Sequence, residues 1–341
     1  MSKHVLVTGG AGYIGSHTVV ALQELGYVPV IVDDFRNANP IVLEGIREIT
    51  KCDIEVHRID CCDKSALESL FSSKKWFGII HFAAYKAVGE SVEEPLKYYR
   101  NNLVNLINVL ELMAQYRVKN LVFSSSCTVY GEPKNSLEVA EETPKQLPSS
   151  PYGYTKWMSE QIIEDFTKAN TWVRVMSLRY FNPIGAHKSA KIGEFPLGKP
   201  NNLLPYITQT AIGKLPHLVV FGKDYPTQDG TCIRDFIHVE DLAEAHVLAM
   251  THLNDQQSIP LSMFNAGTGK GTSVLEMIRC FEKVSSKTLK WEFGDRRPGD
   301  VTAIYANVEN ICQVVGWKAR RSLEESVKSA WEWENYLSSI S

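Results

Sequence analysis

The stretch Thr8-Gly-Gly-Ala-Gly-Tyr-Ile-Gly15 decides how the first half of the chain folds. An apolar run at 4–7, typical of a strand, precedes it, and a helical pattern reaching about Leu25 follows it. Glycine permits a tight turn here and lets the backbone approach a pyrophosphate at a helix N-terminus. This order predicts a dinucleotide site, with a purely structural turn as the alternative. The motif fits as Gly10, Gly12 and Gly15 or as Gly9, Gly12 and Gly15, with Tyr13 and Ile14 inside the turn.

The first 182 residues alternate short apolar runs with helical patterns. This rhythm predicts a Rossmann-type, doubly wound parallel sheet with helices on both faces. The expected strands are 4–7, 28–32, 54–59, 78–82, 120–124 and 173–178, and the expected helices include 64–72, 96–116 and 154–168.

Prolines and glycines crowd the chain after about Asn182, which indicates a domain boundary. We expect residues 1–182, rejoined by about 234–252, to bind the dinucleotide, and 183–341 to form a smaller α/β substrate-binding domain. Further helical patterns begin at Val239 and cover 322–337.

The composition is that of an ordinary globular protein. Of the 341 residues, 44% are hydrophobic and 22% charged, and the net charge is -3, which argues against nucleic acid as a partner. No apolar run approaches the ~20 residues of a membrane span. The N-terminus carries no signal-peptide pattern, so we expect a cytoplasmic protein. The seven cysteines show no Cys-x-x-Cys or zinc-type spacing, so free thiols and no metal site are expected.

Carboxylates at the ends of the second and third apolar runs indicate which dinucleotide binds. Asp33 ends the second run, 18 residues past Gly15, where it can accept both ribose hydroxyls and would repel a 2′-phosphate. NAD is therefore expected rather than NADP. Arg36 is the one residue nearby that would favour NADP, and it is interpreted as a solvated loop residue. Asp60 ends the third run and is placed near the adenine.

A candidate catalytic pair lies at Tyr152 and Lys156, four residues apart, where a helix places both side chains on one face. An ammonium beside a phenol favours the phenolate, which is a base. Bringing a tyrosine pKa of about 10 near neutrality takes roughly 3 units, or ~4 kcal/mol, so a bound nicotinamide cation is expected to help. Ser126 ends a serine run where a hydroxyl could bridge a sugar hydroxyl and Tyr152. Ser124 and Ser125 are interpreted as residues that terminate the strand.

The glycine motif, the serine run and Tyr-x-x-x-Lys together resemble the extended short-chain dehydrogenase/reductase superfamily, and within it the UDP-hexose 4-epimerase branch. The resemblance covers nearly the whole chain. The stretches that carry it are Gly10–His17, His81–Ser91, Leu178–His187, Pro200–Pro205, Asp224–Thr231, Arg234–Val239 and Arg296–Asp300.

The resemblance implies a role for each matching position. Ser126 and Tyr152 would be catalytic, with Lys156 holding the nicotinamide ribose. Positions matching NAD contacts are Gly9, Gly12, Tyr13, Ile14, Gly15, Asp33, Asp60, Phe82, Ala83, Lys86, Asn101, Ser124, Tyr152, Lys156 and Tyr180. Positions around the UDP-sugar are Lys86, Ser126, Tyr152, Phe181, Asn182, Asn201, Asn202, Leu203, Phe221, Tyr225, Arg234, Arg297, Asp300 and Ile304.

The resemblance implies epimerisation at C4 of UDP-galactose and UDP-glucose on tightly bound NAD. It also implies a homodimer, with helices near 96–116 and 154–168 as candidate contact surfaces. Ile304 falls where the family carries either a bulky tyrosine or a small cysteine, so acceptance of N-acetylated sugars stays open.

Alternative activities differ in how well the sequence supports them. A dehydratase would need an Asp-Glu pair after the serine, where this chain has Cys127-Thr128. A hexuronate epimerase is disfavoured by the longer motifs. A non-catalytic NAD-sensing regulator would not need the set Ser126, Tyr152 and Lys156.

Overall fold

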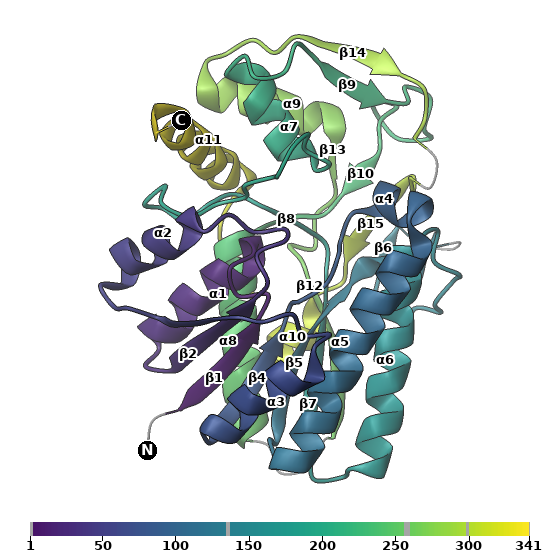
Figure 1. Ribbon diagram of the computed structural model, residues 1–341. Coiled ribbons are helices and arrows are strands. Elements are labelled where there is room, and N and C mark those ends of the chain that lie inside the picture. Colours follow the sequence, from purple (N-terminus) through teal and green to yellow (C-terminus); the bar gives the residue numbers. More distant parts are fainter. Residues whose placement is uncertain (1–2, 134–136, 256–259, 298–299, 341) are drawn as a thin grey trace.

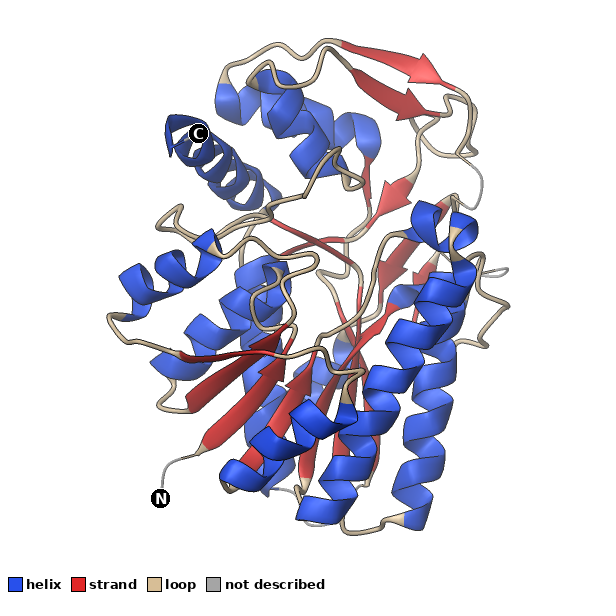
Figure 2. Cartoon of the chain, viewed as in Figure 1, coloured by secondary structure: helices blue, strands red, loops and turns tan. Residues whose placement is uncertain are grey.

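A computed structural model describes residues 3–133, 137–255, 260–297 and 300–340. Its main element is a seven-stranded sheet in the order β12-β7-β5-β4-β1-β2-β3, in which every neighbouring pair is parallel. Helices cover both faces (Figure 2), which confirms the predicted doubly wound α/β fold. The strands are β1 (His4–Thr8), β2 (Val28–Asp33), β3 (Glu55–Arg58), β4 (Trp76–His81), β5 (Asn120–Ser126), β7 (Arg174–Tyr180) and β12 (Leu261–Ala266).

Alternate residues along the strands build two cores, one on each face of the sheet. Val5 and Val7 pack in the core that includes α1 and α8, whereas Leu6 packs in the core of α3, α5 and α6. The buried runs are therefore apolar throughout, as parallel strands covered on both sides require. The helices around the sheet are α1 (Tyr13–Glu24), α2 (Ile41–Thr50), α3 (Lys64–Ser73), α5 (Pro95–Tyr116), α6 (Pro151–Ala169), α8 (Val239–Asp255) and α10 (Glu309–Val315).

Two expected element ends near the candidate catalytic residues need correction. β5 continues through Ser126, so Ser124 and Ser125 lie within the strand and do not terminate it. α6 begins at Pro151, earlier than the expected 154. The Ser150 hydroxyl accepts a hydrogen bond from the Gly153 amide (3.2 Å), and proline suits the first helical position. Tyr152 therefore occupies the first turn of this helix.

The remaining elements form a second group, seen in Figure 1 beyond the end of the large sheet to which its strand arrows point. Small sheets pair β13-β10-β15-β6, β11-β8 and β14-β9. Their strands are β6 (Glu138–Val139), β8 (Asn182–Ile184), β9 (Leu218–Phe221), β10 (Ile233–Arg234), β11 (Phe236–His238), β13 (Thr272–Ser273), β14 (Trp291–Gly294) and β15 (Ala303–Ala306). The other helices are α4 (Val88–Glu93), the 3-10 helix η1 (Cys127–Tyr130), α7 (Leu203–Ala211), α9 (Val274–Ser285) and α11 (Leu323–Ile340).

All seven cysteines are free, as predicted. None of the helices in the described residues is long and apolar enough to cross a membrane. Across the same residues, no group of three or more His, Cys, Asp or Glu side chains is arranged to hold a metal ion.

Candidate active site

The glycine turn connects β1 to α1 and is closely packed. Gly9 has a φ of +69°, and a Cβ there would lie 2.8 Å from the Ala83 amide nitrogen. A Cβ on Gly15 would collide with the carbonyl oxygen of Gly9. The helix N-cap is Gly12, which has no side chain to cap the first amides of α1, and Tyr13 and Ile14 follow it in the first turn. These free amides and the bare backbone fit a dinucleotide pyrophosphate.

Carboxylates mark the ends of β2 and β3 beside this turn. Asp33 accepts hydrogen bonds from the amides of Ala11 (3.0 Å) and Phe35 (2.9 Å), and burial raises its pKa. Asp60 forms an ion pair with Arg36, which also bonds Asp34 (2.8 Å). Arg36 lies in the loop after β2 with its side chain 44% exposed, as expected of a solvated loop residue, and two carboxylates engage its guanidinium group. That Asp33 receives the ribose hydroxyls stays a prediction.

The catalytic candidates meet where β5 ends and α6 begins. Ser126, Tyr152 and Lys156 are all buried, with exposed fractions of 6%, 9% and 5%. The Lys156 Nζ donates a hydrogen bond to the Ser124 carbonyl oxygen (2.6 Å) and lies 5.0 Å from the centroid of the Phe123 ring. The structure therefore brings the predicted base, bridging hydroxyl and cation into one buried corner.

The pKa of Tyr152 differs from the expectation that the neighbouring Lys156 lowers it. Burial raises the pKa of Tyr152 well above its ordinary value, and a hydrogen bond with Ser126 acts in the opposite direction. Burial also lowers the pKa of Lys156 to about 7. Removing the two groups from water thus opposes both the phenolate and the ammonium. An additional positive charge in the site would favour the phenolate.

Several predicted cofactor residues line the ends of β4 and β7. The Tyr180 hydroxyl hydrogen bonds to the Ser124 hydroxyl. Its ring lies 5.8 Å from His246, which in turn lies 4.7 Å from the Phe82 ring (centroid distances). His246 was missed from the sequence, and it joins two residues that were found. Asn101 lies farther out on α5, where its carbonyl accepts from the Cys62 thiol (3.6 Å).

The predicted nucleotide-binding residues gather around one carboxylate in the second group of elements. Asp300 forms ion pairs with Arg234 (3.4 Å) and Arg297 (2.7 Å). The Arg297 guanidinium lies 5.9 Å from the ring of Phe221, which is 44% exposed at the end of β9. Two guanidinium groups beside an exposed aromatic ring suit a diphosphate joined to a planar base. Tyr225 is buried beneath Arg296 instead (4.2 Å), and Pro298 and Gly299 of this motif lie outside the described residues.

Lys86 and Asn202 share another carboxylate. The Glu194 Oε1 accepts from Lys86 (3.1 Å) and from Asn202 Nδ2 (2.6 Å). Lys86 comes from the loop after β4, and Asn202 occupies the N-cap position of α7 without a side-chain capping bond, so this contact joins the two groups of elements. Asn201 is exposed just before this cap, and Leu203 is the first residue of α7.

Phe181 and Ile304 meet in a small apolar cluster against η1, together with Cys127. Ile304 is 4% exposed and pairs with Arg234 between β10 and β15. Asn182 begins β8 directly after Phe181, and its amide donates to the Asp235 carbonyl (3.0 Å). The predicted sugar-facing residues therefore connect the catalytic corner with the arginines.

Comparison with known proteins agrees with this geometry. The model of the NAD dependent epimerase/dehydratase family matches residues 5–267. The chain belongs to this family. It is 49% identical to UDP-glucose 4-epimerase 2 of Arabidopsis thaliana over 336 residues (98% of this chain, 95% of that protein). It is also 49% identical to UDP-glucose 4-epimerase of Bacillus subtilis, over 97% of this chain and 96% of that one.

Solved structures of the epimerase/dehydratase family share the whole fold. UDP-glucose 4-epimerase from Stenotrophomonas maltophila, with bound NAD and formylated UDP-arabinopyranose, superimposes with a TM-score of 0.96 at 43% identity, covering 99% of this chain and 100% of that one. The enzyme from Bifidobacterium longum in complex with NAD+ and UDP gives 0.94 at 41% identity and covers 98% of each chain.

Sequence reasoning missed two buried carboxylates that support the site in this member of the epimerase/dehydratase family. Asp235 is fully buried and accepts from the amides of Thr268, Gly269 and Ala306. Glu160 is 1% exposed and pairs with Arg179. The motif Arg234–Val239 contains Asp235, so the resemblance marked that position without suggesting its role. Nothing in the sequence around Glu160 distinguishes it from a solvated helix residue.

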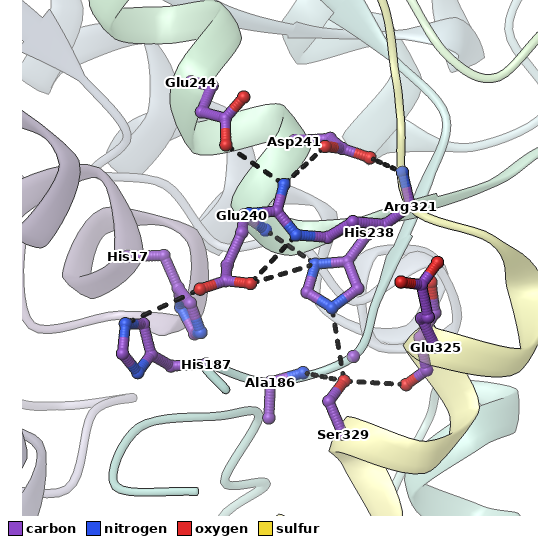
Figure 3. Close-up of polar contacts among 12 residues, drawn as sticks. His17, Ala186, His187, His238, Glu240, Asp241, Glu244, Arg321, Glu325 and Ser329 are labelled. Atoms are coloured by element: carbon purple, nitrogen blue, oxygen red, sulfur yellow. Dashed lines mark hydrogen bonds and ion pairs between the residues drawn. The ribbon is translucent and has the colours of Figure 1, made fainter. Parts of the chain in front are cut away.

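A polar cluster beside the glycine turn was also missed, although its members fall partly in quoted motifs. Figure 3 shows Arg321 at its centre, where it binds Glu240 (3.0 Å), Asp241 and Glu244. Ser329 on α11 accepts from the Ala186 amide (3.0 Å), which fixes the loop after β8. Tyr13 then donates its hydroxyl to the Gly185 carbonyl (2.6 Å). This cluster, which also contains His17, His187 and His238, therefore holds the second group of elements against the glycine turn.

Proposed function

We propose that this chain interconverts UDP-galactose and UDP-glucose by epimerisation at C4, with NAD as its bound cofactor. The observation that carries the proposal is the buried corner of Ser126, Tyr152 and Lys156 beside a glycine turn that fits a dinucleotide. The names of its relatives support the same reaction: eight curated proteins at 47–49% identity are UDP-glucose 4-epimerases, one of them bifunctional with UDP-xylose.

In this mechanism Tyr152, as phenolate, removes the proton of the sugar 4-hydroxyl, and Ser126 bridges the two oxygens by hydrogen bonds. Bound NAD would take a hydride from C4 and give it back to the other face of C4, and its nicotinamide ring would add a positive charge that favours the phenolate. Arg234 and Arg297 hold the diphosphate while the 4-keto sugar turns over, so that its other face is presented. Tyr152 then returns the proton. Lys156 keeps the corner cationic and positions the cofactor ribose.

NAD rather than NADP is supported by the carboxylates near the expected adenosine ribose. No cationic side chain among the described residues pairs with Asp33, and Arg36 is engaged by Asp34 and Asp60. A 2′-phosphate would meet the Asp33 carboxylate and would have to take Arg36 from two ion pairs.

We propose the same division of the chain as the sequence suggested, with 1–182 and about 234–252 binding NAD and the rest of 183–341 binding the UDP-sugar. Packing of α8 beside α1 in one core supports the return of this segment. β12, at 261–266, also joins the large sheet, so the return extends further than 252. Free cysteines support a cytoplasmic location, which we likewise propose.

A homodimer through α5 and α6 is part of the proposal. Val104 and Ile107 lie three residues apart on α5 and are 38% and 39% exposed, and Trp157 on α6 is 36% exposed. Such a patch on two packed helices suits a second copy of the chain. Sedimentation analysis should show a dimer that Ile107→Glu dissociates; a wild-type monomer at micromolar concentration would refute it.

The reaction is tested with purified protein and no added cofactor. Incubation with UDP-galactose should give UDP-glucose, and a separate incubation with the N-acetylated analogue reports the role of Ile304. Release of NAD on denaturation, without conversion of any UDP-sugar, would favour a non-catalytic NAD-sensing protein instead. Conversion of a UDP-hexuronate alone would favour the other epimerase class.

A further inference from the structure

Glu160 continues the catalytic face of α6 into the interior. Tyr152, Lys156 and Glu160 follow one another at intervals of four residues, so their side chains share one side of the helix. Glu160 is 1% exposed, and its carboxylate lies one turn beyond Lys156. Burying a carboxylate is costly unless it is paired and hydrogen bonded, so its partners should reveal what it does.

Two partners of Glu160 lie on β5 and β7, the strands next to the catalytic corner, and the third lies in the segment between β6 and α6. Arg179 on β7 forms a two-pronged ion pair with it, Nε to Oε1 at 2.8 Å and Nη2 to Oε2 at 2.9 Å. Ser125 on β5 donates to Oε1 (2.6 Å), and Lys145 donates to Oε2 (2.6 Å). Ser125 and Arg179 also face each other in the register of β5 and β7. One carboxylate thus ties α6 to the residues that flank Ser124, Ser126 and Tyr180.

Arg179 extends this contact to the segment that follows Ser126. Its Nη1 donates to the Tyr130 hydroxyl (3.0 Å), which donates to Asn265 Oδ1 (2.6 Å). Tyr130 is the last residue of η1, and η1 begins directly after Ser126. The strand end that carries Ser126 is therefore held on both sides by groups that depend on the Glu160–Arg179 pair.

Electrostatics give Glu160 a second effect. Burial lowers the pKa of Lys156 to about 7, and the negative charge of Glu160 acts against this lowering. The Arg179 guanidinium keeps the pKa of Glu160 below its usual range in spite of burial, so this charge is present at neutral pH.

We propose that Glu160 is a positioning residue for the reaction: it clamps α6 to β5 and β7, and its negative charge, one helical turn from Lys156, favours the protonated form of that side chain. The kinetic part rests on the proposed epimerase function. A neutral side chain of the same size would not replace Glu160, because the proposal depends on both the hydrogen bonds and the negative charge of its carboxylate.

Glu160→Gln tests the charge, since the amide keeps the size of the side chain and can still accept from Ser125. We expect it to lower kcat at pH 8 about tenfold and to move the alkaline limb of the kcat–pH profile at least about half a pH unit lower. Glu160→Asp keeps the charge, so its profile should stay in place while kcat falls. Ser125→Ala removes one clamp and should likewise leave the profile unshifted.

The matched control is Glu164→Gln, the same substitution one turn along α6 at a carboxylate whose side chain is 41% exposed. It should match the wild type. If Glu160→Gln does not fold because Arg179 is left unpaired, Glu160→Gln/Arg179→Met removes both buried charges and should show the same shift of the alkaline limb. A folded Glu160→Gln protein with wild-type kcat and an unshifted profile would overturn the proposal.

A measurement that needs no turnover separates this inference from the epimerase proposal. NMR titration of isotope-labelled lysine side chains, with Lys156→Met for assignment, follows the proton on Lys156 directly. The titration midpoint of Lys156 should fall in Glu160→Gln and stay in place in Glu164→Gln. If the wild-type protein converts no UDP-sugar but the midpoint still falls in Glu160→Gln, the epimerase proposal is refuted and the role of Glu160 stands. An unchanged midpoint would refute that role.

Discussion

The two walls of the site are built in opposite ways. On the catalytic wall, Ser126, Tyr152 and Lys156 are at most 9% exposed. On the nucleotide wall, Phe221 is 44% exposed and the Arg297 side chain is 52% exposed. The guanidinium groups of Arg234 and Arg297 both form ion pairs with Asp300. The first wall is organised by contacts within the protein, whereas a diphosphate that binds as we propose would have to replace the Asp300 ion pairs of the second. The catalytic residues thus lie on the central strands and helices, whereas the anchoring residues lie at the ends of short strands and in the loop before β15.

Tyr152→Phe tests the catalytic wall and should have the largest effect. The phenyl ring keeps the packing but cannot take the proton from the sugar 4-hydroxyl. Turnover should fall roughly 1,000-fold, within the usual range for loss of a general base. Chromatography of the UDP-sugars measures the rate, and absorbance after denaturation measures the NAD content, which should stay unchanged.

Tyr154→Phe is the control for this prediction, because it makes the same change on the same helix two residues away. It should leave turnover near the wild-type value. Near-normal activity of Tyr152→Phe would defeat the assignment of the base. Loss of NAD from that variant would mean that the catalytic wall also contributes to holding the cofactor.

Arg297→Leu tests the nucleotide wall. A charge-assisted hydrogen bond to a diphosphate contributes about 1.5–3 kcal/mol, so KM for UDP-galactose should rise about 10- to 150-fold. The value of kcat should change little, since the catalytic wall is untouched. Arg296→Leu is the control, because Arg296 binds Asp224 and Tyr225 instead of Asp300. A variant that loses kcat at constant KM would contradict the separation of the walls.

The sequence predicted the catalytic wall better than the supports behind it. Short-range patterns place Gly9, Tyr152 and Lys156, because their roles depend on local backbone geometry and a four-residue spacing. The pairing of Arg36 with Asp60 was not predicted, because the two residues lie 24 positions apart in the chain. The Glu160–Arg179 pair was missed for the same reason, because packing of α6 against β7 brings together two residues that lie 19 positions apart in the chain. The raised pKa of Tyr152 also depends on burial, which spacing does not reveal.

Acid should weaken the fold through its buried histidines. Burial lowers the pKa of His17 and His81 to about 3, and of His187, His238 and His246 to about 4. Between these values and the ordinary value of about 6.5, the unfolded chain binds more protons than the folded one. The free energy of unfolding should therefore decrease as pH falls from about 6.5 toward 4. Calorimetry at pH 7.5, 6.5 and 5.5 should show a falling Tm.

His246→Asn isolates one of these groups next to the catalytic wall. Between about pH 4 and 6.5, the free energy of unfolding of the variant should change less steeply with pH than that of the wild type, by up to about 1.4 kcal/mol per pH unit. Buried carboxylates with raised pKa values, Asp33 and Glu240, gain protons at the lower end and offset part of the loss. An equal slope in the variant and the wild type would mean that His246 is protonated in the folded chain.

Ile304→Val tests the junction of the two walls and should have the smallest effect. Ile304 is buried against Phe181 and Cys127, yet it belongs to β15, the strand that pairs with the nucleotide-binding Arg234. Removing one methylene enlarges the space for a sugar substituent, so kcat/KM for the N-acetylated substrate relative to UDP-galactose should rise about threefold. Ile207→Val, an equally buried isoleucine of α7, should leave this ratio unchanged. A ratio that moves equally in both variants would mean that loosened packing, and not the shape of the pocket, sets the substrate range.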